Sequence, residues 1–180
     1  MPQYIAFLRA INVGGHTVKM DALQREFESL GFSNVETFIA SGNVIFSTTS
    51  TNASALEAKI ENRLAASLGY DVETFLRTPA EVASIASYKT FADRAIKSAG
   101  AFCVGFLKLP LAAQASRALS ALKSDVDDFH ANAREVYWLC RVKQSESKFS
   151  NAVFEKKVGV STTFRGMKTI ERLAAKLEKR

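Results

Sequence analysis

Residues 35–47 read VETFIASGNVIFS and contain the pattern that decides the fold. Val35–Ile39 and Val44–Ser47 are short runs rich in β-branched and aromatic residues, and Ser41-Gly42-Asn43 between them is favourable turn chemistry. These features predict a β-hairpin. Outward from the hairpin, each side carries apolar residues at helical spacing and then a strand-like segment. The resulting order, β-α-β-β-α-β, is the ferredoxin-like pattern.

Capping and stop signals mark the ends of the two predicted helices in this first half. Gly31 and Gly69 are placed to end the two helices, and Ser54-x-x-Glu57 has the spacing of a capping box at the start of the second. Tyr4–Arg9 and Val72–Arg77 are the predicted outer strands. The helical residues predicted to face the core are Met20, Leu23, Phe27, Leu30, Leu56, Ile60, Leu64 and Leu68.

The same order recurs after a connecting segment. Thr78-Pro79-Ala80-Glu81 predicts the start of a helix, with Thr78 as its cap. The later elements are strands at Ala101–Leu107, Val126–His130, Glu135–Arg141 and Ser161–Phe164, and helices at Leu111–Leu122, Phe149–Val158 and Lys168–Lys179. The sequence therefore predicts an α+β protein with two tandem ferredoxin-like (βαββαβ) halves, antiparallel sheets and a C-terminal helix. We expect residues 1–78 to form the N-terminal half, 79–100 the connecting helix and linker, and 101–180 the C-terminal half.

Several predicted strands are apolar on both faces. Tyr4–Leu8 and Val136–Leu139 are continuous apolar runs, whereas a sheet with helices on one face only should alternate with polar residues. An uncovered face would expose an apolar patch of roughly several hundred Å². We therefore expect the second face of each sheet to be covered, by face-to-face packing of the two sheets, by their merger, or by homodimerisation. The sequence does not decide between a monomer and a homodimer.

Composition indicates an ordinary globular protein. The chain has 180 residues, of which 47% are hydrophobic and 23% charged. The longest apolar run, Ala99–Leu107, is too short for a membrane helix, and the N-terminal segment is typical of a strand rather than a signal peptide. Cys103 and Cys140 lie in apolar strand-like runs, which predicts reduced, buried thiols. We expect a cytoplasmic protein without a membrane partner.

Polar residues and glycines gather at one edge of the first predicted sheet. In this topology the first two strands are parallel, so the end of the first strand lies beside the hairpin turn. The loop between that strand and the first helix contains Gly14-Gly15, and the free N–H groups at a helix start favour anions. Plain turn chemistry is the competing explanation. The candidate ligand-binding residues are Arg9, Asn12, Gly14, Gly15, His16, Lys19, Ser41, Gly42 and Asn43.

The net charge of +6 lies at the C-terminal end. Residues 148–180 contain nine Lys and Arg and three Asp and Glu, whereas the first 147 residues contain 15 of each kind. Such a cluster could contact phosphates of a nucleic acid, or it could be a solvated helix face. The hairpin strand at residues 42–47 lacks the basic and aromatic residues of an RNA-reading sheet. This secondary basic patch comprises Ser147, Lys148, Arg165, Lys168, Arg172 and Lys176.

No motif of a familiar enzyme is present. A phosphate-binding Walker loop, a dinucleotide fingerprint and a Gly-x-Ser-x-Gly motif are all missing. His16 is the one group at the candidate site that titrates near neutrality. His130 follows Asp125, Asp127 and Asp128, which we interpret as a solvated acidic turn rather than a cation site. We expect no metal and no cofactor, and no residue is assigned as catalytic.

Three segments carry a family resemblance: Arg9-Ala10-Ile11-Asn12-Val13-Gly14-Gly15, Leu30-Gly31-Phe32 and Ser41-Gly42-Asn43-Val44-Ile45-Phe46. Together with Arg77-Thr78 they resemble the bacterial "domain of unknown function 1697" family. The resemblance implies ferredoxin-like halves and no established activity. The chain departs from the family pattern at Ala10, Ala40 and Arg165-Gly166-Met167-Lys168-Thr169. The family's motif positions here are Asn12, Gly14, Gly15, Ser41, Gly42, Asn43, Ser147, Lys148, Thr163 and Arg165.

The sequence thus favours a module that binds an anionic, phosphate-bearing ligand at the Gly14-Gly15 edge. An enzyme acting on a small phosphorylated substrate, with His16 as its acid or base, is one alternative. A nucleic-acid binder that uses the basic C-terminal helix is the other.

Overall fold

The computed structural model describes residues 1–12, 14–40 and 42–180. The chain divides into two compact units, Met1–Ala83 and Ser84–Arg180. Each unit contains its own four-stranded antiparallel sheet with helices, so the protein is α+β as predicted. The two sheets share no strand, which rules out their merger into one sheet. No helix in the described residues combines the length and apolar character needed to span a membrane.

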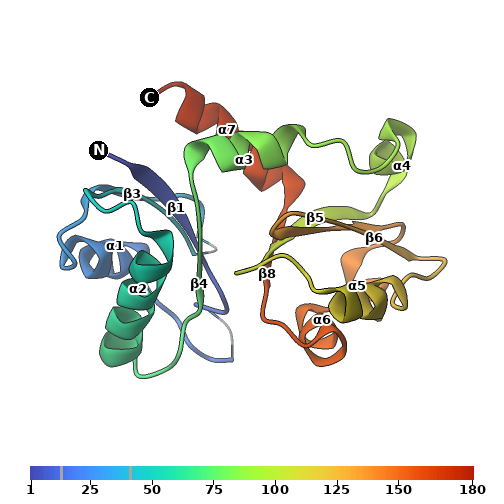
Figure 1. Ribbon diagram of the computed structural model, residues 1–180, viewed down its shortest axis with the longest axis horizontal. Coiled ribbons are helices and arrows are strands. Elements are labelled where there is room, and N and C mark those ends of the chain that lie inside the picture. Colours follow the sequence, from blue (N-terminus) through green and yellow to red (C-terminus); the bar gives the residue numbers. More distant parts are fainter. Residues whose placement is uncertain (13, 41) are drawn as a thin grey trace. The chain divides into compact units, whose positions relative to one another are not determined.

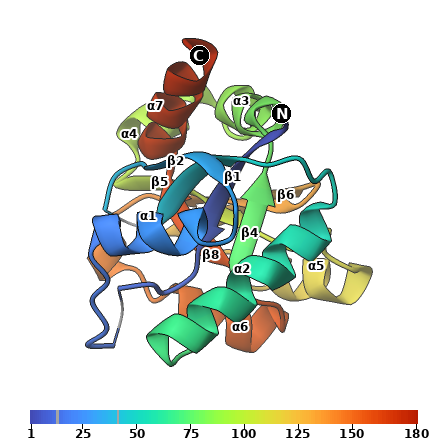
Figure 2. The same ribbon diagram turned by 90° about the vertical axis from the view of Figure 1, so that its left-hand side faces the viewer.

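The first unit has the predicted order of elements. They are β1 (Gln3–Leu8), α1 (Met20–Glu28), β2 (Ser33–Thr37), β3 (Asn43–Ser47), α2 (Ala53–Leu68) and β4 (Thr74–Arg77), followed by α3 (Pro79–Ser87). The strand order in the sheet is β2-β3-β1-β4. Helices α1 and α2 lie side by side across the same face of this sheet (Figure 2). This arrangement is the ferredoxin-like topology, in which the end of β1 lies next to the β2–β3 turn.

The second unit repeats the topology. Its elements are α4 (Asp93–Ser98), β5 (Ala101–Phe106), α5 (Ala113–Ser120), β6 (Asp127–Asn132), β7 (Glu135–Cys140), a 3₁₀ turn at Gln144–Glu146, α6 (Asn151–Val158), β8 (Thr163–Gly166) and α7 (Met167–Glu178). The strand order, β6-β7-β5-β8, matches that of the first sheet position by position. Helices α5 and α6 pack against each other on one side of the sheet (Figure 1).

The core of each unit lies between its sheet and its two helices. In the first unit Ala6 and Leu8 pack with Phe27 and Ile60, and in the second Trp138 packs in the same manner with Phe154. Burying such side chains contributes about 1.5–3 kcal/mol each. The opposite strand faces are buried too, since the side chains of Ile5, Phe7, Val104 and Phe106 have no exposed surface. Both cysteines are free thiols and buried, as the sequence predicted.

The start of α2 differs from the prediction. Asn52, not Ser54, caps the helix, because its Oδ1 accepts the N–H of Ala55 at 3.0 Å. Glu57 is buried instead of closing a capping box, and its Oε1 accepts the N–H of Leu76 at 3.0 Å. The predicted cap of α3 is confirmed: Thr78 Oγ1 accepts the N–H of Glu81, whose carboxylate accepts the N–H of Thr78.

Equivalent residues make equivalent contacts in the two units. The Leu8 N–H donates to Gly42 O, and the Leu107 N–H donates to Arg134 O, both at 2.9 Å. The last strand of each sheet carries a buried arginine. Arg77 lies opposite Ile5, and Arg165 lies opposite Val104. Each donates Nη1–H to the carbonyl of the residue before it, and a helix, α3 or α7, starts two residues later. The repeated unit is therefore β-α-β-β-α-β-α.

Candidate functional site

The structure brings together two of the segments that the sequence singled out. Residues 9–19 connect β1 to α1, and residues 38–43 form the β2–β3 turn; we call their meeting place the loop–turn site. Besides the bond between Leu8 and Gly42, the Asn12 Nδ2–H donates to Ala40 O at 3.4 Å. Ser41 lies outside the described residues, so its part in the site is not described.

Asn12 holds the loop in shape. Its Oδ1 accepts the N–H of Val18 at 2.8 Å, while its Nδ2 reaches the β2–β3 turn. Both ends of the amide are therefore bonded to backbone, although the side chain is exposed. Asn12, one of the candidate ligand-binding residues, therefore positions the loop.

Gly42 and Asn43 build the turn and are buried. The backbone of Gly42 has a φ of +80°, and a Cβ there would lie 2.7 Å from Ile11 Cγ2. Only glycine meets both demands. Asn43 closes the turn, since its Nδ2–H donates to Phe38 O at 2.9 Å and its carbonyl accepts the Phe38 N–H at 2.8 Å. These two residues thus fix the shape of the turn on which the site is built.

Gly14 and Gly15 are placed quite differently. Both are exposed and have φ values of +68° and +84°, and no atom lies within 4 Å of where a Cβ would be. Packing therefore does not explain the glycines, whereas the left-handed backbone does. Among the described residues, neither glycine donates its N–H to a partner. Within the described residues, the loop thus has two successive backbone donors on exposed residues.

Tyr70 completes the site and was missed from the sequence. Its hydroxyl donates to Ile11 O at 2.9 Å, and the His16 ring stacks on the Tyr70 ring with centroids 3.8 Å apart. Burial raises the pKa of Tyr70, which keeps the hydroxyl available as a donor. The predicted topology could have indicated Tyr70. The segment before β4 lies beside the end of β1, as the bond from Arg9 N–H to Glu73 O shows, and Tyr70 lies in that segment, four residues before Thr74.

Charges of both signs flank the loop. Lys19 is exposed at the N-cap position of α1, and Arg9 at the end of β1 is half-buried. Asp21 lies in the first turn of the helix, where its Oδ1 accepts the Ala22 N–H and its Oδ2 lies 3.4 Å from Arg25 Nη1. The negative charge of Asp21 repels an anion at the start of the helix. The nearby positive charge of Arg25 weakens this repulsion.

The backbone around the site is strained. Ala10 and Ile39, one on each segment, have φ values of +55° and +58°. Such conformations cost roughly 1–3 kcal/mol for residues other than glycine, most of all for a β-branched one. The Ile39 side chain is also 41% exposed, so burial does not compensate for its strain. Strain of this kind is concentrated at functional sites in proteins.

The residues of the predicted secondary basic patch have different surroundings in the structure. Ser147 and Lys148 line a cavity between the loop that joins α5 to β6 and the first turn of α6, and the lining includes none of the other four residues. Arg165 is buried, its Nη1–H donates to Thr163 Oγ1, and desolvation lowers its pKa to about 10. Lys168 and Arg172 are exposed on α7, and Lys176 is half-buried there.

The predicted solvated acidic turn is also different in the structure. Asp127 is only 5% exposed, and its carboxylate accepts hydrogen bonds from Trp138 Nε1 at 2.8 Å and Ser147 Oγ at 2.7 Å. His130 is directed elsewhere, with its Nε2 at 3.1 Å from the Tyr88 hydroxyl. In the described part of the chain, no three His, Cys, Asp or Glu side chains are grouped so as to hold a metal ion.

Comparison with known proteins identifies relatives but no activity. A family model described as "Protein of unknown function (DUF1697)" matches residues 1–137. The solved structure of the conserved bacterial protein SP0830 from Streptococcus pneumoniae is similar over 99% of both chains, with a TM-score of 0.73 and 21% sequence identity. That likeness shows the fold. No curated protein sequence matches the chain.

Proposed function

We propose that this chain, which belongs to the DUF1697 family of proteins of unknown function, binds an anionic, phosphate-bearing ligand at the loop–turn site. The observation that carries the proposal is the pair of exposed glycines, whose backbone N–H groups have no partner among the described residues. Adjacent N–H groups in a loop before a helix are a recurring means of holding phosphate oxygens.

The charges support the same ligand class. Lys19 is placed at the start of α1, where the helix dipole adds a partial positive charge. An ammonium group together with oriented N–H groups makes charge-assisted hydrogen bonds, which are roughly twice as strong as neutral ones. A neutral ligand would gain little from either feature.

The site is held in shape before any ligand arrives. Asn12 and Tyr70 fix the loop from two sides, and Asn43 closes the neighbouring turn. A loop that is already ordered loses little conformational entropy on binding, which favours affinity. The strain at Ala10 and Ile39 agrees with a backbone selected for binding rather than for stability.

A pair of glycine variants tests the proposal. Gly15 and Gly31 both have a φ of +84° and open space at the Cβ position, but Gly31 follows α1 at its other end. Gly15→Ala and Gly31→Ala should therefore destabilise the protein about equally, by roughly 1–2 kcal/mol. Only Gly15→Ala also places a methyl group on the proposed phosphate-binding backbone and changes the direction of its N–H groups.

The measurement is a thermal-shift series with inorganic phosphate, a sugar phosphate and a nucleoside monophosphate, each compared with its phosphate-free counterpart. A ligand at 100 times its Kd adds about 2.7 kcal/mol, which raises the Tm by a few degrees. We expect a phosphate-dependent shift in the wild type and in Gly31→Ala, and none in Gly15→Ala. Equal shifts in both variants would refute the loop–turn site.

One observation favours an enzyme that acts on the same ligand class. The stacking on Tyr70 holds His16, an imidazole that can exchange protons, next to Gly14 and Gly15. In that case His16→Asn abolishes turnover of a phosphorylated substrate but leaves its binding intact. If the wild type shows no turnover of the phosphorylated substrate and His16→Asn lowers its binding, the result supports a binding module instead.

A further inference from the structure

We propose that the second unit contains a separate binding site for a small amphipathic anion, a carboxylate attached to a short apolar body. The site is a cavity of about 470 Å³, lined by the loop between α5 and β6, by residues 146–149 before α6 and by the first turn of α6. Cavities of this size hold small organic molecules. None of its lining residues belongs to the loop–turn site, so the proposal does not depend on the function proposed above.

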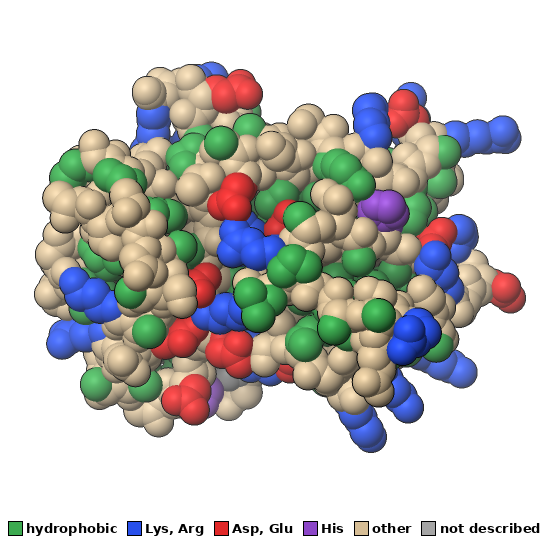
Figure 3. Space-filling view, viewed as in Figure 1, with side chains coloured by type: hydrophobic (Ala, Val, Ile, Leu, Met, Phe, Trp, Pro, Cys, Tyr) green, Lys and Arg blue, Asp and Glu red, His purple; other side chains and the backbone are tan. Residues whose placement is uncertain are grey.

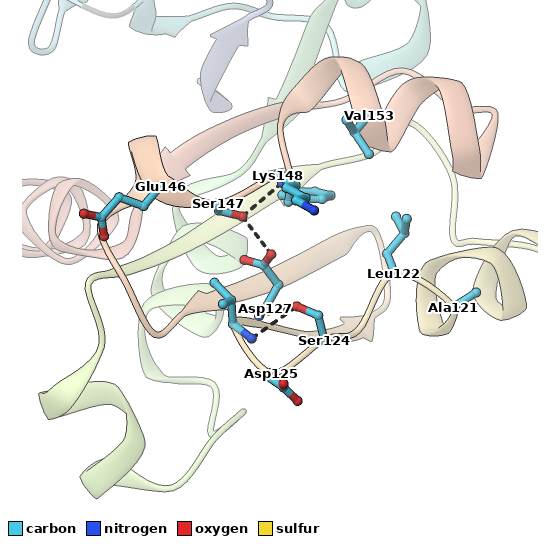
Figure 4. A pocket seen from close by; sticks show the side chains of 11 residues that line it. Ala121, Leu122, Ser124, Asp125, Asp127, Glu146, Ser147, Lys148 and Val153 are labelled. Carbon is cyan, nitrogen blue, oxygen red and sulfur yellow. Dashed lines mark hydrogen bonds between the residues drawn. The ribbon is translucent and has the colours of Figure 1, made fainter.

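The walls of the cavity are apolar. Leu122 follows α5 and Val153 lies in the first turn of α6, and Figure 4 shows their side chains on opposite sides of the same space. Phe149 forms a further part of the wall and is held by its edge-on contact with Phe154. An apolar body of a few carbon atoms would be removed from water on entering, and the burial of its surface favours binding.

One end of the cavity is polar and rigid. Ser147 Oγ–H donates to Asp127 Oδ2 at 2.7 Å, and the same oxygen accepts the Phe149 N–H at 2.9 Å (Figure 4). The other oxygen of Asp127 accepts the Trp138 Nε1–H. Both carboxylate oxygens are therefore engaged by protein donors, so Asp127 stabilises the turn before α6 and is not presented to a ligand.

Lys148 supplies the charge that a ligand would meet. In Figure 4 its side chain extends toward the space between Asp127 and Leu122, whereas the carboxylates of Asp125 and Glu146 extend away from it. The Glu146 Oε2 accepts the Lys143 N–H at 3.3 Å. In the described residues, the Lys148 ammonium forms no ion pair. An ammonium beside apolar walls fits a carboxylate with an apolar body.

Further basic side chains lie on the two helices next to the cavity. Arg117 in the last turn of α5 and Lys156 and Lys157 in the last turn of α6 are exposed. Figure 3 shows Lys and Arg side chains gathered over these two helices. Positive surface charge near a site speeds the approach of anions and slows that of cations. Because the carboxylates of Asp125 and Glu146 also line the cavity, the preference for a carboxylate over an amine depends on Lys148 together with these basic side chains.

Three probes with the same apolar chain test the ligand class by isothermal titration of the full-length protein: octanoate, octan-1-ol and octylamine. We expect octanoate to bind at least tenfold more tightly than octan-1-ol, and octylamine to bind most weakly. Octylamine binding as tightly as octanoate, or no binding of octanoate at millimolar concentration, would overturn the proposal.

Three variants locate the site. Lys148→Met keeps the length of the side chain and removes its charge, so it should lower octanoate affinity at least tenfold and leave octan-1-ol unchanged. Lys156→Met removes a similar charge outside the cavity lining and should change octanoate affinity less than threefold. Val153→Phe should fill the cavity and weaken both ligands, with near-ultraviolet circular dichroism as the check on folding. Unchanged octanoate affinity in Lys148→Met contradicts the assigned role of Lys148.

Discussion

The two halves share one topology but differ in the connection that follows their first strand. In the first unit residues 9–19 connect β1 to α1, whereas in the second the shorter segment 107–112 connects β5 to α5. The shorter segment already meets the demands of the fold, because the Leu107 N–H makes the same bond as that of Leu8. Within the longer segment Ile11 and Val18 are buried in the core of the first unit, whereas Gly14 and Gly15 are exposed and have no packing role.

The turns next to these connections differ as well. The first unit has Gly42 and Asn43 where the second has Arg134 and Glu135. In the second unit Ala133 adopts the positive φ, at +49°. Only two residues separate β6 from β7, whereas β2 ends at Thr37 and β3 begins at Asn43, so the two hairpins have different turns. In the first unit Gly42 is required by its φ of +80° and by the position of Ile11 against the turn.

The largest expected effect comes from filling that contact. Gly42→Val would place a Cβ 2.7 Å from Ile11 Cγ2 in a left-handed backbone, and we expect a loss of about 3–5 kcal/mol of unfolding free energy. Gly31→Val meets the same backbone strain without a clash and should lose about 1–2 kcal/mol. Urea unfolding measures both. Similar losses of unfolding free energy in the two variants would mean that the loop moves and relieves the clash with Ile11.

A second contrast concerns the outer edge of the last strand. In the first unit Glu57 and Glu61 of α2 accept the N–H groups of Leu76 and Thr74, both at 3.0 Å. In the second unit Glu155 of α6 accepts the Thr162 N–H at 3.0 Å.

Asn151 precedes Glu155 by the same spacing as Glu57 precedes Glu61, but its buried Oδ1 has no partner in the described structure. Glu57→Ala leaves the Leu76 N–H without this acceptor and should cost about 1–3 kcal/mol. Asn151→Ala removes an amide oxygen that bonds to nothing and should cost less than about 0.5 kcal/mol. Chemical denaturation gives both free energies. A larger loss in Asn151→Ala than in Glu57→Ala would contradict this contrast between the two edges.

A smaller, pH-dependent difference follows from the cysteines, which occur only in the second unit. Burial, reinforced by the neighbouring Cys140, raises the pKa of Cys103 from 9.0 to about 11. The unfolded thiol ionises first as the pH rises, so the unfolded state is favoured. The contribution of this thiol to stability is therefore complete below pH 9 and is lost between pH 9 and about 11.

Trp138 is the one tryptophan of the chain and lies in the second unit, so its fluorescence reports that unit. Unfolding followed by Trp138 should shift to lower urea concentration between pH 9 and about 11, and Cys103→Val should reduce the shift. The same pH dependence in Cys103→Val would assign the effect to another group.

The sequence was sufficient for the features that depend on local chemistry. Gly69 is the left-handed C-cap of α2, and Ser41-Gly42-Asn43 indicated the hairpin, because these signals act within a few residues. The helix before Gly31 ends slightly earlier, at Glu28. The sequence failed where several neighbouring residues competed for one role. Asn52 and Ser54 can both cap a helix, and the fold selected Asn52.

Long-range contacts explain the remaining failures. Asp125, Asp127 and Asp128 look alike in the sequence, and only the pairing of β6 with β7 places Asp127 within reach of the Trp138 indole. Tyr70 joins the loop–turn site through a bond to Ile11, 59 residues away in the sequence. Such contacts are set by topology, so they could be found only after the strand order was known.

The most direct test of the central claim follows the backbone amides themselves. In a ¹H–¹⁵N spectrum of the full-length protein titrated with inorganic phosphate, the Gly14 and Gly15 signals should shift and saturate, while Gly31 and Gly159, which share the φ of Gly15, stay in place. Saturating shifts at the two loop glycines alone are the predicted result. Shifts concentrated on α7, or none at Gly14 and Gly15 at millimolar phosphate, would contradict the account.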